Sequence, residues 1–95
     1  MTNLRKEARG RSCQIRLPGC EHKSPTVVGA HYRLAGLSGA GQKPNDIFIA
    51  WACRNCHDLA DSRKPYDGDR SVLRLAHAEG VFRTQEILRK EGKIG

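Results

Sequence analysis

The chain has 95 residues, of which 38% are hydrophobic, so it has room for one small core and not for two. No stretch approaches the roughly 20 consecutive apolar residues that a membrane-spanning helix requires. The polar N-terminal sequence, MTNLRKEARGR, also lacks the apolar segment of a secretion signal. We therefore expect a single domain over residues 1–95 that works in the cytoplasm, without a membrane partner.

Lysine and arginine outnumber the acidic residues by 17 to 10, which gives a net charge of +7. The excess lies at the two ends of the chain. Residues 1–16 carry five basic groups and one acid, residues 17–62 carry four of each, and residues 63–95 carry eight basic groups and five acids. Basic arms of this kind fit contact with the phosphates of a nucleic acid. A solvated basic surface is also common in small soluble proteins, so charge favours a nucleic-acid partner without establishing one.

The first regular elements predicted along the chain are two strands joined by a loop. The charged segment 4–16 leads to a Pro-Gly turn, and the alternating sequence of residues 26–33, TVVGAHYR, predicts a strand. The glycine-rich sequence that follows, with Pro44 near its end, predicts a loop. Residues 47–52, IFIAWA, form the most hydrophobic run. They predict a buried strand whose large side chains, from Ile47 onward, belong to the core.

Two helices are predicted to follow the strands. A turn at the third cysteine leads into a short helix over residues 57–62. Ser71 can cap a second helix within the C-terminal segment 71–91. Gly80 lies inside this helix and costs about 1 kcal/mol relative to alanine, so the pattern permits a kink there. The predicted fold class is α+β, with a β-hairpin, a short helix and a C-terminal helix.

The four cysteines fall in two pairs, one on each side of the predicted strands. Six residues separate Cys13 from Cys20, whereas Cys53 and Cys56 form a Cys-x2-Cys knuckle whose tight turn directs both thiols inward. Four thiolates that converge in this way would hold one zinc ion and give a treble-clef finger. Disulfides and free thiols are alternatives that a reducing cytoplasm disfavours. A c-type haem site matches residues 53–57, but it would require export and an apolar pocket.

A histidine and a carboxylate follow the knuckle at helical spacing. His57 and Asp61 lie four residues apart, so on a helix they share one face and could hold one divalent ion. A surface ion pair, or His57 as a zinc ligand beside three cysteines, would explain the same spacing. His31 favours the first interpretation, because a hairpin can bring it opposite His57. We assign no function to His22 or His77.

These motifs resemble those of the HNH, or ββα-metal, nucleases, in particular the branch with a four-cysteine zinc site. The chain is most similar to the small YbcO-like nuclease family of prophages, over residues 13–61, about half of its length. The fold that this resemblance implies is a small zinc-stabilised treble-clef domain with its core over residues 13–63. The residues that carry the resemblance occur in the order of the family: Cys13, Cys20, Ala30-His31, Asn45, Cys53-Arg54-Asn55-Cys56-His57 and Asp61.

The resemblance implies a role for each matching residue. His31 corresponds to the strand histidine that acts as general base, and His57 to the helix histidine that ligates the catalytic metal. Asn45 corresponds to the middle asparagine, which fixes the loop so that the base is correctly turned. The four cysteines, Cys13, Cys20, Cys53 and Cys56, correspond to the structural zinc site.

The chain departs from the family pattern in its metal shell. Many members have an acid directly before the first histidine as a second metal ligand, but here that residue is Ala30. We infer that Asp61 supplies the missing carboxylate from the helix. Asp46, the neighbour of Asn45, is the alternative residue that could point into the site.

The resulting hypothesis is a metal-dependent endonuclease that hydrolyses phosphodiester bonds in nucleic acid, with DNA as the expected substrate. Zinc would be the structural ion, and Mg²⁺ or another divalent cation the catalytic one. Arg33, on the strand face of His31, and Arg54, on the knuckle, could clamp phosphates, although each could equally be a solvated surface residue. The alternatives are a non-catalytic zinc-finger adaptor that binds nucleic acid and a protein-binding zinc module. The sequence leaves the oligomeric state open.

Overall fold

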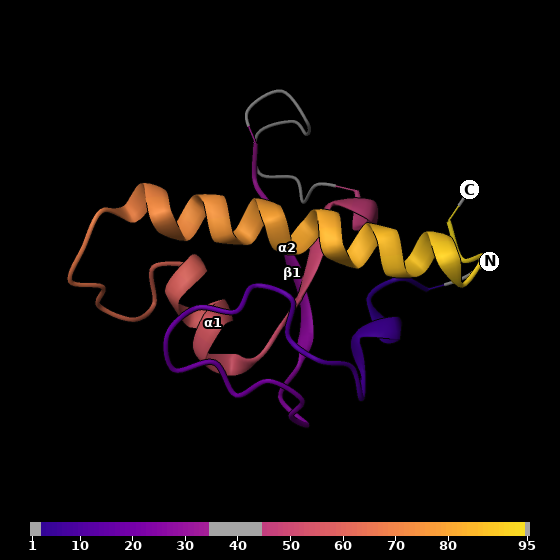
Figure 1. The fold of residues 1–95 in the computed structure, drawn as a ribbon, viewed down its shortest axis with the longest axis horizontal. Coiled ribbons are helices and arrows are strands. Elements are labelled where there is room, and N and C mark those ends of the chain that lie inside the picture. The colour runs from indigo at the N-terminus through magenta and orange to yellow at the C-terminus, as the bar shows by residue number, and fades with distance from the viewer. Residues whose placement is uncertain (1–2, 35–44, 95) are drawn as a thin grey trace.

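The structure is a computed structural model that describes residues 3–34 and 45–94. A two-stranded antiparallel sheet lies beside a long C-terminal helix (Figure 1). The α+β class predicted from the sequence is therefore confirmed. Within the described ranges the elements, in chain order and with η for a 3₁₀ helix, are η1 (Lys6–Ala8), β1 (Val28–His31), η2 (Asp46–Phe48), β2 (Ile49–Ala52), α1 (Arg54–Ala60) and α2 (Arg70–Lys90).

β1 and β2 pair along their whole length, with His31 opposite Ile49, but both strands are shorter than predicted. All four residues of β2 are buried, whereas Ile47, expected in the same strand, is 38% exposed. A local contact keeps Ile47 out of β2: the side chain of Asn45 accepts a hydrogen bond from Ile47 N and so caps η2. The predicted buried strand is confirmed over Ile49–Ala52, but its predicted start at residue 47 was wrong. The loop predicted before it falls largely on residues 35–44, outside the described ranges.

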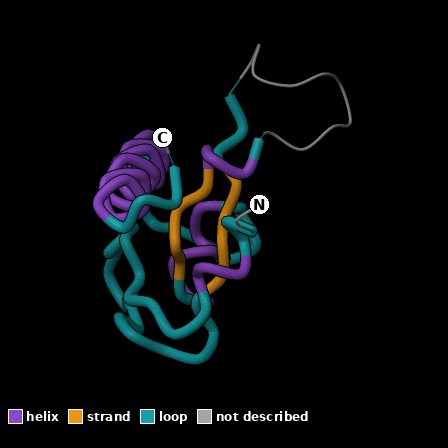
Figure 2. Tube along the Cα trace, turned by 90° about the vertical axis from the view of Figure 1, so that its right-hand side faces the viewer, coloured by secondary structure: helices purple, strands orange, loops and turns teal. Residues whose placement is uncertain are grey.

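α2 is one continuous helix of 21 residues that lies to one side of the strand pair (Figure 2). Asp69 caps it by accepting a hydrogen bond from Ser71 N at 2.9 Å, so Ser71 is not the cap residue. At Gly80, a Cβ atom would stand 3.1 Å from the Cβ of Ala50 and 3.2 Å from the carbonyl oxygen of Gln14. Glycine therefore permits close packing on the sheet, and α2 is not kinked there. Across the described residues, no helix is long and apolar enough to cross a bilayer.

Trp51 is a core residue of β2 that contacts both the N-terminal segment and α2. Its side chain is 1% exposed, and the guanidinium of Arg11 lies 4.6 Å from the centroid of its ring. Its backbone N–H donates to the hydroxyl of Thr84, a fully buried residue of α2, at 3.0 Å. The sheet is therefore fixed against α2 on one side.

Candidate metal centre and active site

The four cysteine side chains converge between the N-terminal segment and the start of α1. Their sulfur atoms all lie within 4.8 Å of one another, and Cys20 Sγ is 4.0 Å from Cys53 Sγ. Sulfurs bound to one zinc ion at about 2.3 Å stand about 3.8 Å apart, close to this spacing. Cys20 is half-buried and the other three are buried. These four residues, here called the cysteine centre, are therefore placed to bind a metal ion.

Backbone amides point at the sulfurs of the cysteine centre. Such hydrogen bonds stabilise a thiolate, which is the form of cysteine that ligates metals. The hydrogen bond from Cys56 also lowers the pKa of the Cys13 thiol to about 4, and the same contact raises the pKa of Cys56. The donor set suits a thiophilic ion. The amide contacts are Leu17 N to Cys56 Sγ at 3.4 Å, Glu21 N to Cys53 Sγ at 3.3 Å and His22 N to Cys20 Sγ at 3.3 Å.

A turn specified by the sequence brings the first cysteine pair together. Cys20 N donates to the carbonyl oxygen of Leu17 at 3.0 Å, and Gly19 has a φ of 81°. Proline at the second position and glycine at the third are the residues that favour a type II turn. The side-chain amide of Asn55 donates to the carbonyl oxygen of Pro18 at 3.0 Å. This contact ties the turn to the second knuckle and compensates for the long spacing of the first pair.

The second knuckle also starts α1. The helix begins at Arg54, three residues before the predicted start at residue 57, with Cys53 as its N-cap residue. The side chain of Cys53 makes no capping bond, and instead the hydroxyl of Thr26 accepts the N–H of Arg54 at 3.1 Å. The cysteine centre therefore fixes the position of the helix that carries His57.

His57 and Asp61 lie on one face of α1, as their spacing predicts. His57 Nε2 is 3.0 Å from Asp61 Oδ2, and the same oxygen pairs with Nη2 of Arg63 at 3.3 Å. Adjacent ligands of an octahedral ion with bonds of about 2.0–2.1 Å stand about 2.9 Å apart. The spacing of the two side chains thus fits two ligands of one divalent ion.

A carboxylate from η2 holds His31. His31 Nε2 lies 2.8 Å from Asp46 Oδ1, and Asp46 Oδ2 pairs with Nε of Arg5 at 3.3 Å. The side chain of His31 is 12% exposed and thus mostly buried, but it lines a cavity and is not part of the hydrophobic core. Asn45, the residue matched to the middle asparagine, caps η2, and among the described residues the hydrogen-bond partner of His31 is Asp46 and not Asn45. Of the two candidate acids, Asp61 contacts His57 and Asp46 contacts His31.

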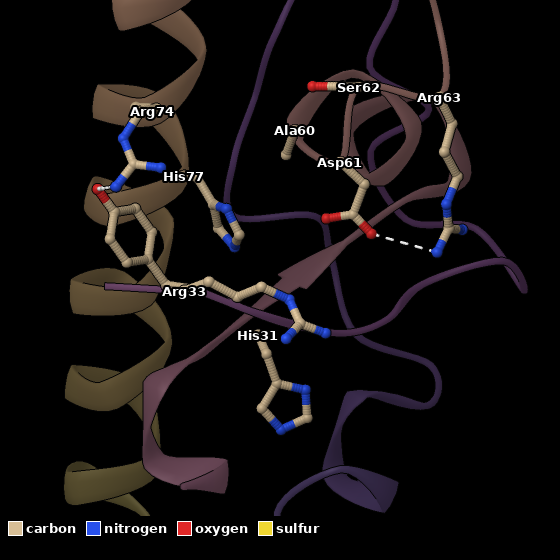
Figure 3. A pocket seen from close by; sticks show the side chains of 9 residues that line it. His31, Arg33, Ala60, Asp61, Ser62, Arg63, Arg74 and His77 are labelled. Atoms are coloured by element: carbon tan, nitrogen blue, oxygen red, sulfur yellow. Dashed lines mark hydrogen bonds and ion pairs between the residues drawn. The ribbon is translucent and has the colours of Figure 1, made fainter. Parts of the chain in front are cut away.

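The two histidines line one cavity, between β1 and α1. This cavity has a volume of about 240 Å³ and adjoins a second of about 350 Å³ that reaches α2. Figure 3 shows the carboxylate of Asp61 and the guanidinium of Arg33 directed into the second cavity. The first cavity, here called the cleft, is lined by Arg5, Gly29, His31, Arg33, His57, Asp61 and Arg63.

The two arginines predicted to contact phosphate lie in different places. Arg33 is exposed and lines both cavities, beside His31. Arg54 is exposed at the start of α1 and is not among the described residues that line either cavity. The structure therefore brings Arg33, but not Arg54, to the histidines.

His77 is a site residue that sequence analysis missed. It is 6% exposed, and its Nε2 lies 3.0 Å from the carbonyl oxygen of Ala30. Burial lowers the pKa of His77, so the neutral ring donates this hydrogen bond and fixes β1 directly before His31. The spacing of His77 from Leu73 and Val81, four residues on either side and both buried, is the signal that could have placed it on the buried face of α2.

Comparison with known proteins identifies the family. The family model described as "Putative nuclease YbcO" matches residues 2–93. The chain belongs to the YbcO family. The resemblance to YbcO-like proteins inferred from the sequence is thereby confirmed.

Two relatives and one solved structure agree with this assignment over nearly the whole chain. The YbcO-family chain is 47% identical over 95 residues to "Putative nuclease YbcO" of Escherichia coli K12, and equally to a protein of the same name from Enterobacteria phage 82. Each alignment covers 99% of this chain and 98% of the relative. A solved structure from Escherichia coli K-12 MG1655, described as "Structure of a putative bacteriophage protein", superposes with a TM-score of 0.78 at 41% identity. This superposition covers 95% of this chain and 100% of that one.

Proposed function

We propose that this protein is a metal-dependent endonuclease of the HNH type, which hydrolyses phosphodiester bonds in the DNA of a phage or its host. We further propose that residues 1–95 act as one HNH-like domain. One observation carries the proposal: His31 and the His57–Asp61 pair, from separate elements, line the same cleft. The nuclease names of the relatives support the reaction class.

The two candidate metal positions have different tasks. The cysteine centre would hold a zinc ion, because four thiolate ligands are typical of structural zinc, and this ion would fix the N-terminal segment to α1. His57 and Asp61 would hold a second divalent ion, such as Mg²⁺. Such an ion would supply the positive charge that polarises a phosphate and stabilises a leaving oxygen.

His31 acts as the general base. Its Nε2 is bonded to Asp46, and Figure 3 shows the other ring nitrogen on the side of Arg33. Nδ1 therefore takes the proton from the attacking water, while the carboxylate of Asp46 accepts the Nε2 hydrogen bond and stabilises the imidazolium that forms. Arg33 binds an oxygen of the phosphate through its guanidinium.

Nicking of supercoiled plasmid tests the proposal. The wild-type protein should nick DNA when Mg²⁺, Mn²⁺ or Ni²⁺ is added, and His31→Ala should lower the rate constant by about 10²- to 10⁴-fold. Zinc content and DNA affinity should stay unchanged, because His31 does not contact the cysteine centre. His22→Asn is the matched control, since His22 is exposed outside the cleft and asparagine tolerates its φ of 55°.

The absence of cleavage by the wild-type protein, with all three cations and on duplex, branched and single-stranded substrates, would contradict the proposal. Zinc-containing protein that binds DNA without cleaving it would instead be a zinc-finger adaptor. A His31→Ala protein with wild-type activity would also contradict it, because another group would then activate the water.

A further inference from the structure

We propose that one nucleic-acid strand crosses the cleft in a continuous groove beside β1 and contacts the protein through phosphates on both sides of the scissile bond. This inference rests on the proposed nuclease function and adds the binding path of the substrate. It assigns nucleic-acid binding to the N-terminal segment around η1, which the catalytic proposal leaves without a function.

The groove consists of three cavities that share lining residues. A cavity of about 300 Å³ lies between η1 and β1 and shares Arg5 and Gly29 with the cleft. The cleft in turn shares four residues with the cavity of about 350 Å³ that reaches α2. The cleft, with His31 and His57, is therefore the middle section of a longer groove. The four shared residues are His31, Arg33, Asp61 and Arg63.

Both ends of the groove are basic. Lys6 and Arg9 line the end beside η1, and Arg74 lines the end beside α2. Arg63 lies where that end joins the cleft, and it pairs with Asp61 and Asp58. All four residues are exposed. Among the described residues that line the three cavities, Asp61 is the only acid, and we have assigned it to the metal. Cationic side chains on each side of a reactive centre are the pattern expected for a backbone that continues in both directions.

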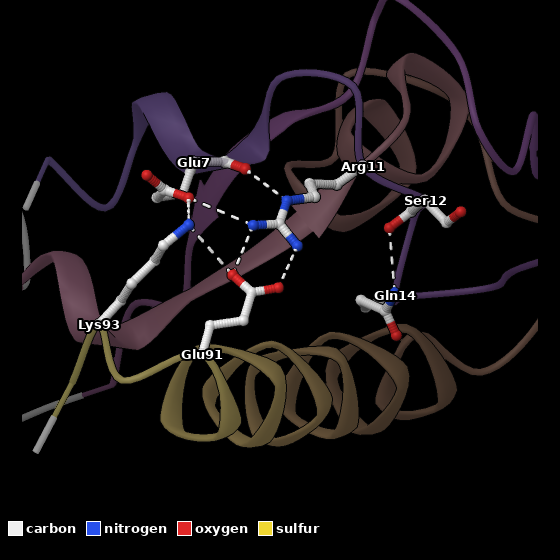
Figure 4. A network of polar contacts seen from close by, with 6 residues as sticks. All are labelled: Glu7, Arg11, Ser12, Gln14, Glu91 and Lys93. Atoms are coloured by element: carbon white, nitrogen blue, oxygen red, sulfur yellow. Dashed lines mark hydrogen bonds and ion pairs between the residues drawn. The ribbon is translucent and has the colours of Figure 1, made fainter.

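Glu7, the acid of the N-terminal segment, does not line the groove, because its carboxylate points toward the C-terminal end of α2. Glu7 accepts hydrogen bonds from Arg11 and Lys93, on the side of the segment that meets the C-terminal end of α2 (Figure 4). Glu91 binds both terminal nitrogens of Arg11 at 2.6 Å each. These charge-assisted hydrogen bonds hold η1 in place, with Lys6 directed to the groove.

The basic residues at both ends of the groove also favour binding of the interior of a nucleic-acid strand over binding of its terminus. A site for a terminal nucleotide would need cationic groups on one side of the histidines only. Here Arg9 and Arg74 line the two outer cavities, which share no lining residue with each other among the described residues, whereas each shares residues with the cleft. A strand bound to both arginines must therefore pass His31 and continue beyond it.

Salt-dependent binding of a fluorescein-labelled single-stranded DNA of about 12 nucleotides tests the path. Fluorescence anisotropy would be measured on zinc-containing protein without added divalent cation, so that no strand is cleaved. The double variants Lys6→Ala/Arg9→Ala and Arg63→Ala/Arg74→Ala should each reduce the slope of log K against log salt by about 0.7 for every phosphate that the variant no longer neutralises. The two reductions should add in the quadruple variant, because one strand occupies both ends at once.

Lys23→Ala/Lys90→Ala is the matched control. It removes the same charge from exposed lysines that line none of the three cavities, and it should leave the slope near the wild-type value. A slope unchanged in the η1 double variant, or an equal reduction in the control, would overturn the proposed path. The result is independent of cleavage. If both double variants reduce the slope but the wild-type protein does not cleave DNA, the binding path is supported and the nuclease proposal is refuted. If only one double variant reduces the slope and the protein cleaves DNA, the nuclease proposal is supported and the binding path is refuted.

Discussion

The cysteine centre and the cleft are held in different ways. In the cysteine centre the backbone does the positioning, through the turn at Gly19 and the amides that contact the sulfurs. In the cleft, side chains position other side chains, as Asp46 does for His31. The backbone arrangement of the cysteine centre forms only when the whole domain folds. A side-chain contact in the cleft can be removed by one substitution while the domain stays folded. We therefore expect substitutions in the cysteine centre to unfold the protein and substitutions in the cleft to change its reaction.

The largest effect is expected from Cys56→Ser. Structural zinc contributes about 10–16 kcal/mol of binding free energy in zinc-finger peptides, comparable to the whole stability of a small domain. The variant should lose its zinc and its cooperative unfolding transition, as measured by metal analysis and circular dichroism. His57→Ala, one residue away, should keep both. A folded Cys56→Ser protein with one zinc ion, or a His57→Ala protein without zinc, would break the distinction between the two sites.

A smaller effect, confined to catalysis, is expected from Asp46→Asn. Asparagine can still contact His31 but cannot stabilise its imidazolium form with a negative charge. The rate constant for nicking should fall about tenfold or more, and by less than the 10²- to 10⁴-fold expected for His31→Ala. Asp67→Asn, in an exposed loop, is the control. Wild-type activity in the Asp46→Asn protein would show that Asp46 does not support the base.

The two sites also differ in how far the sequence predicts them. The Cys-x2-Cys knuckle, the Pro-Gly turn and the four-residue spacing of His57 and Asp61 are local patterns, and the structure brings each set of side chains together. The partners of His31 depend on tertiary structure. A single 3₁₀ turn directs Asp46 rather than Asn45 to the histidine. Arg5, from the N-terminal segment and far from Asp46 in the sequence, pairs with the same carboxylate.

The prediction of burial at Ile47 was wrong, and α2 continues through Gly80 as one helix although the sequence permitted a kink there, for related reasons. Ile47 has the hydrophobicity of a core strand residue, but the cap at Asn45 places it in η2, where it is exposed. Gly80 signals a weak helix in the sequence, and only the neighbouring sheet shows that a larger side chain would not fit. The three-dimensional surroundings decided both cases, and the hydrophobic pattern of the sequence does not encode them.

The smallest effect concerns stability below neutral pH and arises at His77. Burial lowers its pKa below the ordinary value of 6.5, and among its charged neighbours Asp61 opposes this shift while His57 and Arg74 add to it. Between the two pKa values the unfolded chain binds the proton that the folded chain does not, so falling pH favours unfolding. The contribution is present above about pH 6.5 and is lost as pH falls toward the pKa of the folded protein.

Thermal unfolding between pH 7.5 and pH 5.5 measures this contribution. His77→Gln can still donate to the carbonyl oxygen of Ala30 but does not titrate, so its melting temperature should fall less over this range than that of the wild type. His22→Asn should retain the wild-type dependence, because His22 is exposed. Equal pH dependence in all three proteins would mean that His77 does not couple folding to protonation.

Anomalous X-ray diffraction from crystals soaked in manganese chloride tests most directly whether the cleft holds a divalent ion of its own. We expect a manganese peak within coordination distance of His57 Nε2 and the carboxylate of Asp61, on the side of the cleft that His31 faces. The zinc signal should remain at the four sulfurs. Manganese binding that avoids the cleft, or zinc bound by His57 in place of a cysteine, would contradict the separation of the two sites.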